Sequence, residues 1–184
     1  MKKFLLLVLA TPYLLISQNK AFDSLNIVLK TVKNDTTKMN VLYQIFQTCA
    51  NDDAVWPKYN EQILKLGETL SQSNNEIIKL KGKKAVAEAL NNIGYLANTE
   101  GDIPKAIEYY TKSLKLQEEV GDKKGMGSTF NNFGYIYEHK GDPVKAIQFY
   151  QKSLKIQEDL NDKKDIATVL NNIAHVYETQ GKVK

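Results

Sequence analysis

Apolar residues recur at helical spacing from about residue 84 onward, and the pattern returns with a period of 40 residues. Residues 91–95 (NNIGY) match 131–135 (NNFGY), and residues 112–115 (KSLK) match 152–155 (KSLK). A third copy begins with NNIA at 171–174. Chance does not align so many positions in register twice, so the chain contains an internal structural repeat.

Each period predicts two helices joined by a short turn. The apolar face of the first helix in the first period carries Leu90, Ile93, Gly94 and Ala97. Gly101 predicts the end of this helix, and Asp102 predicts the cap of the second. The second helix carries Ala106, Tyr109, Tyr110 and Leu114. A glycine inside a helix costs about 1 kcal/mol, so Gly94, facing Ala106, predicts close contact between the two helices.

The prediction is an all-α fold, a right-handed superhelical array of antiparallel helix hairpins. Less regular residues precede the repeats, and we expect them to form one divergent hairpin. The expected organisation is a signal peptide at 1–17, a divergent N-terminal hairpin and lead-in at 19–83, repeat 1 at 84–122, repeat 2 at 123–162, and the first helix of an incomplete repeat 3 at 163–184.

At these residues the sequence resembles the tetratricopeptide repeat family. The family pattern falls on Leu90, Ile93-Gly94, Ala97, Ala106, Tyr110 and Ser113, and on the positions 40 residues later. Ala97 departs from the expected aromatic residue, and the period exceeds the common one of about 34 residues. This longer form is similar to the subgroup that binds extended peptides or partner helices, as in the N-terminal region of bacterial sensor histidine kinases.

The first helices of such an array line a concave face. Stacking of the repeats predicts a row of amides beside a row of rings on this face: Asn92, Asn132 and Asn172 beside Tyr95, Tyr135 and His175. Asparagine can pair with the backbone of an extended peptide, and aromatic rings add contact area. The resemblance implies that role for the three asparagines. The alternative is structural: the Asn-Asn pairs bridge adjacent repeats, and the tyrosines pack.

Charge and composition narrow the class of partner. The formal net charge is +4, of which Lys2 and Lys3 leave with the signal peptide, and the chain contains no arginine. Arginine is the preferred residue for phosphate and base recognition, so we expect a protein or peptide partner and no nucleic acid. His139 and His175 lack partners at metal-ligand spacing. We expect no metal, no cofactor and no enzymatic activity, since neither a phosphate loop nor a nucleophile elbow occurs.

The N-terminus predicts export. A short positive segment precedes an apolar stretch from Phe4 to Ile16, and Ser17/Gln18 fits a cleavage site. The alternative, an uncleaved anchor, is disfavoured because the stretch is shorter than about 20 residues and contains Pro12. After signal removal we expect no membrane span in these residues, and a periplasmic or secreted protein. Cys49 is expected to be a small buried hydrophobe.

The last predicted helix, about 164–180, would leave Ile173 and Tyr177 without a covering helix. Such a stripe marks either an interface or a truncation, and truncation is the interpretation we favour. The first functional hypothesis is an exported module that binds a peptide or partner protein in its concave groove. The second is the sensory N-terminal fragment of a longer membrane-bound signalling protein, with any catalytic domain beyond residue 184.

Overall fold

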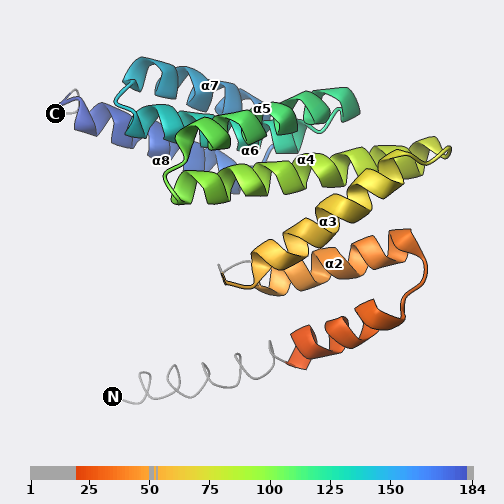
Figure 1. The fold of residues 1–184 in the computed structure, drawn as a ribbon. Helices are drawn as coiled ribbons and strands as arrows, with labels where there is room; N and C mark the ends of the chain where they lie inside the picture. The colour runs from red at the N-terminus through yellow and green to blue at the C-terminus, as the bar shows by residue number, and fades with distance from the viewer. Residues whose placement is uncertain (1–19, 50–51, 53, 182–184) are drawn as a thin grey trace, which may run out of the picture.

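The structure is a computed structural model that describes residues 20–49, 52 and 54–181. Residues 20–31 are helical. The helices that follow are α2 (Asp35–Cys49), α3 (Trp56–Ser71), α4 (Glu76–Thr99), α5 (Ile103–Val120), α6 (Lys123–His139), α7 (Pro143–Asp159) and α8 (Lys163–Thr179) (Figure 1). The predicted signal peptide at 1–17 lies outside the described residues.

The helices stack as consecutive antiparallel hairpins (Figure 1). Each helix packs against the next in sequence, and α4 also contacts α6, as α6 contacts α8. From α4 onward, the first helix of each hairpin therefore lies beside the first helix of the next. This arrangement confirms the predicted all-α solenoid.

The helix ends follow the repeat. The side chains of Asp102, Asp142 and Asp162 cap the helices that follow, each accepting from a backbone N–H three residues on (3.2, 3.1 and 3.2 Å). Asp122 does the same for α6. The turn before this cap needs a left-handed residue: Gly121 has a φ of 67°, and Asn161 has a φ of 54° at the same position of the next repeat.

The glycines of the repeat are sites of close helix contact. A Cβ built on Gly94 would lie 2.7 Å from the ring of Tyr110, and one on Gly134 would lie 2.4 Å from the ring of Tyr150. Both rings are buried, because they lie directly on the backbone of the preceding helix. The prediction that these glycines allow close packing is confirmed.

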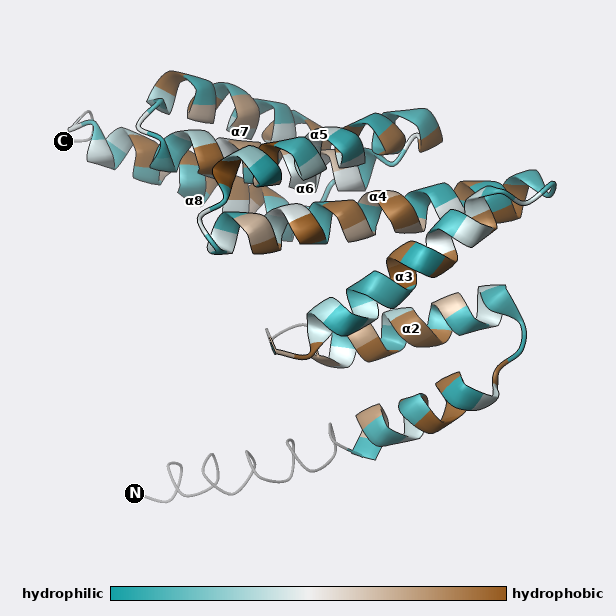
Figure 2. Ribbon diagram, viewed as in Figure 1, coloured by the Kyte–Doolittle hydropathy of each residue, from teal (hydrophilic) through white to brown (hydrophobic). Residues whose placement is uncertain are grey.

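The apolar side chains gather between the helices (Figure 2). Around α2 and α3 the core includes Cys49 and Trp56, both buried, which confirms the packing role predicted for Cys49. The prediction for Ile173 was wrong: Ile173 is partly buried and packs against the apolar cluster that α7 and α8 share. The exposed apolar residues of α8 include Leu170 and Tyr177. Among the described residues, no helix is long and apolar enough to cross a bilayer.

Candidate partner-binding groove

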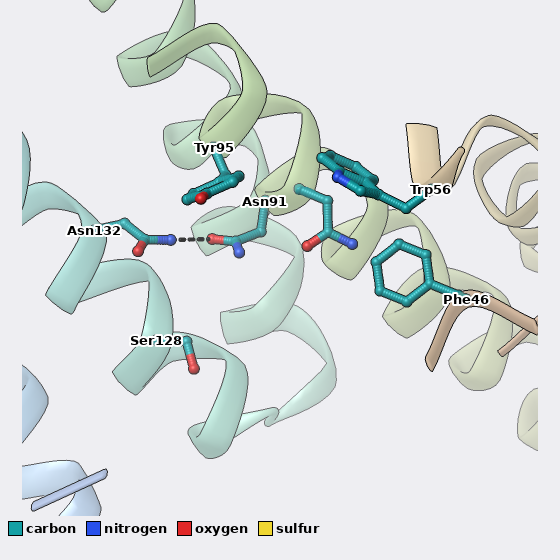
Figure 3. A pocket seen from close by; sticks show the side chains of 7 residues that line it. Phe46, Trp56, Asn91, Tyr95, Ser128 and Asn132 are labelled. Carbon is teal, nitrogen blue, oxygen red and sulfur yellow. Dashed lines mark hydrogen bonds between the residues drawn. The ribbon is translucent and has the colours of Figure 1, made fainter. Parts of the chain in front are cut away.

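A groove with a volume of about 360 Å³ hollows the face on which α2, α4 and α6 meet. Its lining residues come from three of the first helices and from the start of α3: Phe46, Trp56, Asn91, Asn92, Tyr95, Ser128 and Asn132 (Figure 3). One hairpin could not form this hollow, because its walls come from residues of separate hairpins.

The structure brings three of the six predicted site residues, Asn92, Asn132 and Tyr95, into this groove. Tyr135, Asn172 and His175 are not among its lining residues; they lie on α6 and α8. Tyr95 and Tyr135 keep 48% and 45% of their surface exposed. Their rings are therefore available for contact with a partner.

The asparagine side chains connect adjacent repeats. Nδ2 of Asn92 donates to Oδ1 of Asn60 (2.9 Å), and Nδ2 of Asn132 donates to Oδ1 of Asn91 (3.2 Å). Asn172 donates in the same way to Asn131 (2.9 Å). Each bond uses one N–H of the second asparagine of a pair, and an amide has a second N–H and an oxygen to offer. Bridging between repeats and contact with a ligand are thus compatible.

Two aromatic residues of the groove were not predicted as site residues. Phe46 and Trp56 make an edge-to-face pair, with ring centroids 5.9 Å apart, at the end of the groove formed by the divergent hairpin. Trp56 also packs in the core of this hairpin. Its indole and the side chain of Asn92 both line the groove, and Figure 3 shows the indole beside the ring of Phe46. An amphipathic Trp at the start of a helix is the signal that could have suggested this role.

Glu138 is a largely buried side chain that joins neighbouring helices. Its carboxylate accepts from the hydroxyl of Tyr150 (2.6 Å) and lies 2.5 Å from Nδ1 of His175. Burial, and then the neighbouring Glu138, raise the pKa of Tyr150 above its usual range. Glu138 of α6 therefore links α7, through Tyr150, and α8, through His175.

Two acidic residues, Glu88 and Asp122, lie near Tyr43 of α2. Burial raises the pKa of Tyr43, and the nearby Glu88 raises it further. The pKa of Glu88 is raised, first by desolvation, while its hydrogen bond with Tyr43 acts in the opposite direction. Lys84 pairs with Asp122 at 3.3 Å and offsets part of this negative charge.

No group of histidine, cysteine and acidic side chains that could hold a metal ion occurs in the part of the chain that the structure describes. Cys49 is buried, and this burial raises the pKa of its thiol, so the reactive thiolate is disfavoured. The chemistry that the groove offers is amide hydrogen bonding and aromatic contact.

The sequence and the fold were compared with those of known proteins to identify the family of this chain. The tetratricopeptide repeat family matches residues 85–159 and 125–184. The crystal structure of BtubC (BKLC) from P. vanneervenii is similar, with a TM-score of 0.64 and 14% identity over 90% of this chain. At this identity the likeness shows the fold alone, and this chain spans 65% of the length of BtubC. MamA gives a TM-score of 0.41 at 19% identity, over 79% of this chain and 91% of MamA. No curated protein matches.

Stacked helix hairpins with a hollowed inner face define a helical-repeat scaffold for protein–protein interaction. The family match extends over more than half of the chain, and the chain belongs to the tetratricopeptide repeat family. The fold of this family is an interaction scaffold without catalytic machinery of its own.

Proposed function

We propose that the chain binds an extended segment of a partner protein in the groove between α2, α4 and α6. The observation that carries this proposal is the composition of the groove: exposed aromatic surface stands beside asparagine amides with hydrogen-bonding capacity to spare. Rings supply contact area at low entropic cost, and amides pair with the main chain of a peptide.

The groove suits a peptide better than a small molecule. Its volume of about 360 Å³ is spread along three helices, and residues of all three line it. The exposed ring of Tyr135 extends the aromatic surface along α6 beyond the groove. A partner that follows this line would contact Tyr95 and then Tyr135, which are 40 residues apart in sequence.

The test starts from peptides selected from a random library displayed on phage against the whole chain. The chain has one tryptophan, Trp56, and it lines the groove, so peptide binding is expected to shift its emission. Tyr95→Ala is expected to weaken binding at least tenfold, as for an aromatic anchor of about 1.4 kcal/mol or more. Tyr177→Ala is the matched control, because Tyr177 is also an exposed tyrosine but does not line the groove.

The proposal fails if no peptide is enriched, or if the two tyrosine variants weaken binding equally. The second result would mean that the peptide binds elsewhere on the array. A double variant, Asn92→Ala with Asn132→Ala, then separates the amides from the rings; thermal unfolding of the same sample reports the loss of the bridges between repeats.

Export belongs to the proposal as well. The positive and apolar segments of residues 1–17 support it. Fusing residues 1–30 to a reporter enzyme that is active only outside the cytoplasm tests it, and an inactive fusion would refute export.

The alternative function is the sensory part of a longer membrane-bound signalling protein. The exposed Leu170 and Tyr177 of α8 favour it, because they form a surface on which a further helix could pack. Sequencing the gene past the codon for Lys184 decides between these two.

A further inference from the structure

A second hollow of the concave face lies between α6, α7 and α8, and we call it the Gln157 pocket. Its volume is about 100 Å³, and Gln157, Asp165 and Val169 are among its lining residues. Ser128 and Asn132 line both this pocket and the larger groove, so the two hollows adjoin.

Gln157 stands out because its amide oxygen has no partner. The side chain is 1% exposed. Its Oε1 is the buried side-chain oxygen in the described part of the chain for which no hydrogen bond is found. Buried polar groups are almost always paired, because an unpaired acceptor destabilises the fold. Because Gln157 also lines a pocket, its unpaired oxygen points to a ligand that would donate a hydrogen bond to it.

The preceding repeat shows what is missing. Gln117 occupies the equivalent position, and its Oε1 accepts from the hydroxyl of Thr129 (3.0 Å). The residue 40 positions after Thr129 is Val169, which is buried and has no hydroxyl. Asp165 also replaces Gly125 of the preceding repeat. The third repeat thus loses a donor and gains a carboxylate at the same place.

The hydroxyls and the carboxylate of the pocket favour a ligand that donates hydrogen bonds, although Asn131 and Asn132 place amide N–H groups in its lining as well. The hydroxyls of Ser128, Ser153 and Thr168 each donate to a backbone carbonyl (3.3, 2.8 and 3.1 Å). A hydroxyl has one donor, so these groups have oxygen lone pairs left for a ligand. Asp165 is the charged residue among the lining residues, and it is negative.

We propose that the Gln157 pocket binds an alkylammonium group, whose N–H donors reach Oε1 of Gln157 and the carboxylate of Asp165. An ammonium has three donors and no acceptor, and its bonds to a carboxylate are charge-assisted. The volume of about 100 Å³ exceeds the roughly 30 Å³ that one water occupies in the liquid. The expected source is a lysine side chain of the partner in the adjoining groove, and this part rests on the proposed function.

The test uses n-butylammonium chloride as the probe, titrated into the whole ¹⁵N-labelled chain and followed by NMR. Sodium chloride at equal ionic strength and sodium butyrate are the controls. Saturable shifts are expected at the side-chain amide of Gln157 and at the backbone amides of Asp165 and Val169, with the butylammonium salt only. Absence of saturable shifts would overturn the proposal and mean that the pocket holds water alone.

Three variants make the assignment specific. Val169→Thr supplies the hydroxyl that Thr129 supplies in the preceding repeat, and is expected to weaken butylammonium binding at least tenfold. Val144→Thr makes the same change at an exposed site of α7 and is expected to leave binding unchanged. Gln157→Met removes the oxygen at similar size and is expected to abolish the shifts. Equal binding by Val169→Thr and the unaltered chain would overturn the proposal even if Gln157→Met does not fold.

A peptide arm distinguishes the two sources of the ammonium group. Peptides selected on the groove are tested with each lysine replaced by norleucine, which keeps the chain length and removes the charge. If replacing one lysine of a peptide weakens its binding tenfold to the unaltered chain but not to Val169→Thr, the ammonium group in the pocket comes from the partner. Butylammonium binding without any such loss assigns it to a free amine. If butylammonium binds but no peptide does, the proposal for the Gln157 pocket is supported and the proposed peptide groove fails. If a peptide binds but butylammonium does not, only the proposal for the pocket is overturned.

Discussion

The exchange of threonine for valine between repeats leads to a pair of variants with opposite expected effects. Thr129 is buried, and its hydroxyl lies 3.0 Å from both Oδ1 of Asn91 and Oε1 of Gln117. Thr129→Val leaves the buried amide oxygen of Gln117 unpaired. Such a loss costs about 1–3 kcal/mol, so the free energy of unfolding is expected to fall by that amount.

Val169→Thr is expected to act in the other direction. Burying a new hydroxyl without a partner costs about 1–3 kcal/mol. Here the new hydroxyl meets the unpaired Oε1 of Gln157, and a net hydrogen bond contributes about 0.5–1.5 kcal/mol. We therefore expect this variant to be unchanged in stability or up to about 1 kcal/mol more stable.

Urea unfolding followed by circular dichroism measures both variants. Midpoints are compared at unchanged m-value, because a changed m would mean that the repeats no longer unfold together. Val144→Thr, at an exposed site, is the control and is expected to change stability by less than about 0.5 kcal/mol. If Val169→Thr destabilises as much as Thr129→Val, the hydroxyl does not reach the amide and the reasoning about Gln157 is refuted.

Three further predictions concern packing, charge and reactivity. Gly134→Ala places a Cβ 2.4 Å from the buried ring of Tyr150; overpacking should exceed the helix-propensity gain and lower stability by about 1–2 kcal/mol in urea unfolding. Ala174→Gly, at the exposed equivalent position, should lose about 1 kcal/mol through helix propensity alone, and a gain of stability in Gly134→Ala would contradict close contact. The pKa of Asp162 is lowered, first by its bond to a lysine, so its charge stabilises the fold above the usual pKa and this contribution is lost as the pH falls through the lowered one. Asp162→Asn keeps a capping side chain, and should unfold at a lower temperature than the unaltered chain at pH 7. The difference should shrink as the pH falls through the lowered pKa of Asp162, and a difference independent of pH would exclude the charge. Cys49 is buried with a raised pKa, so a thiol reagent should modify it far more slowly in buffer than in urea, and equal rates would mean that the end of α2 is open.

Much of the fold was predictable because its signals are local. A helix cap needs an aspartate followed three residues later by a free N–H, and this pattern is visible at Asp102 and Asp142. The turn that requires a left-handed residue is marked by Gly121. Because the period is 40 residues, each of these local signals recurs at the same position of the next repeat, and the recurrence supports the prediction. The match to the tetratricopeptide repeat family agrees with this reasoning.

The groove was predictable only in part. Helical spacing indicates that Asn92 and Tyr95 lie on one face of α4, and both line the groove. It does not indicate that Phe46, from the divergent hairpin, lies opposite them. Nor does it show that Asn92 is bonded to Asn60, since that contact depends on how the two hairpins stack.

The sequence by itself determined the repeat, the helices, their caps and the close contacts at Gly94 and Gly134, because each depends on residues within one hairpin. Only the tertiary structure decided which residues of different hairpins meet: Glu138 with His175, and Phe46 with the face of α4. The change from Thr129 to Val169 is visible in the sequence. Its consequence, a buried oxygen without a donor, follows only once Gln157 is known to lie beside it. The physical reason is that hydrogen bonds within a turn of helix are fixed by the spacing of the chain, whereas contacts between repeats are fixed by how the side chains of each interface pack.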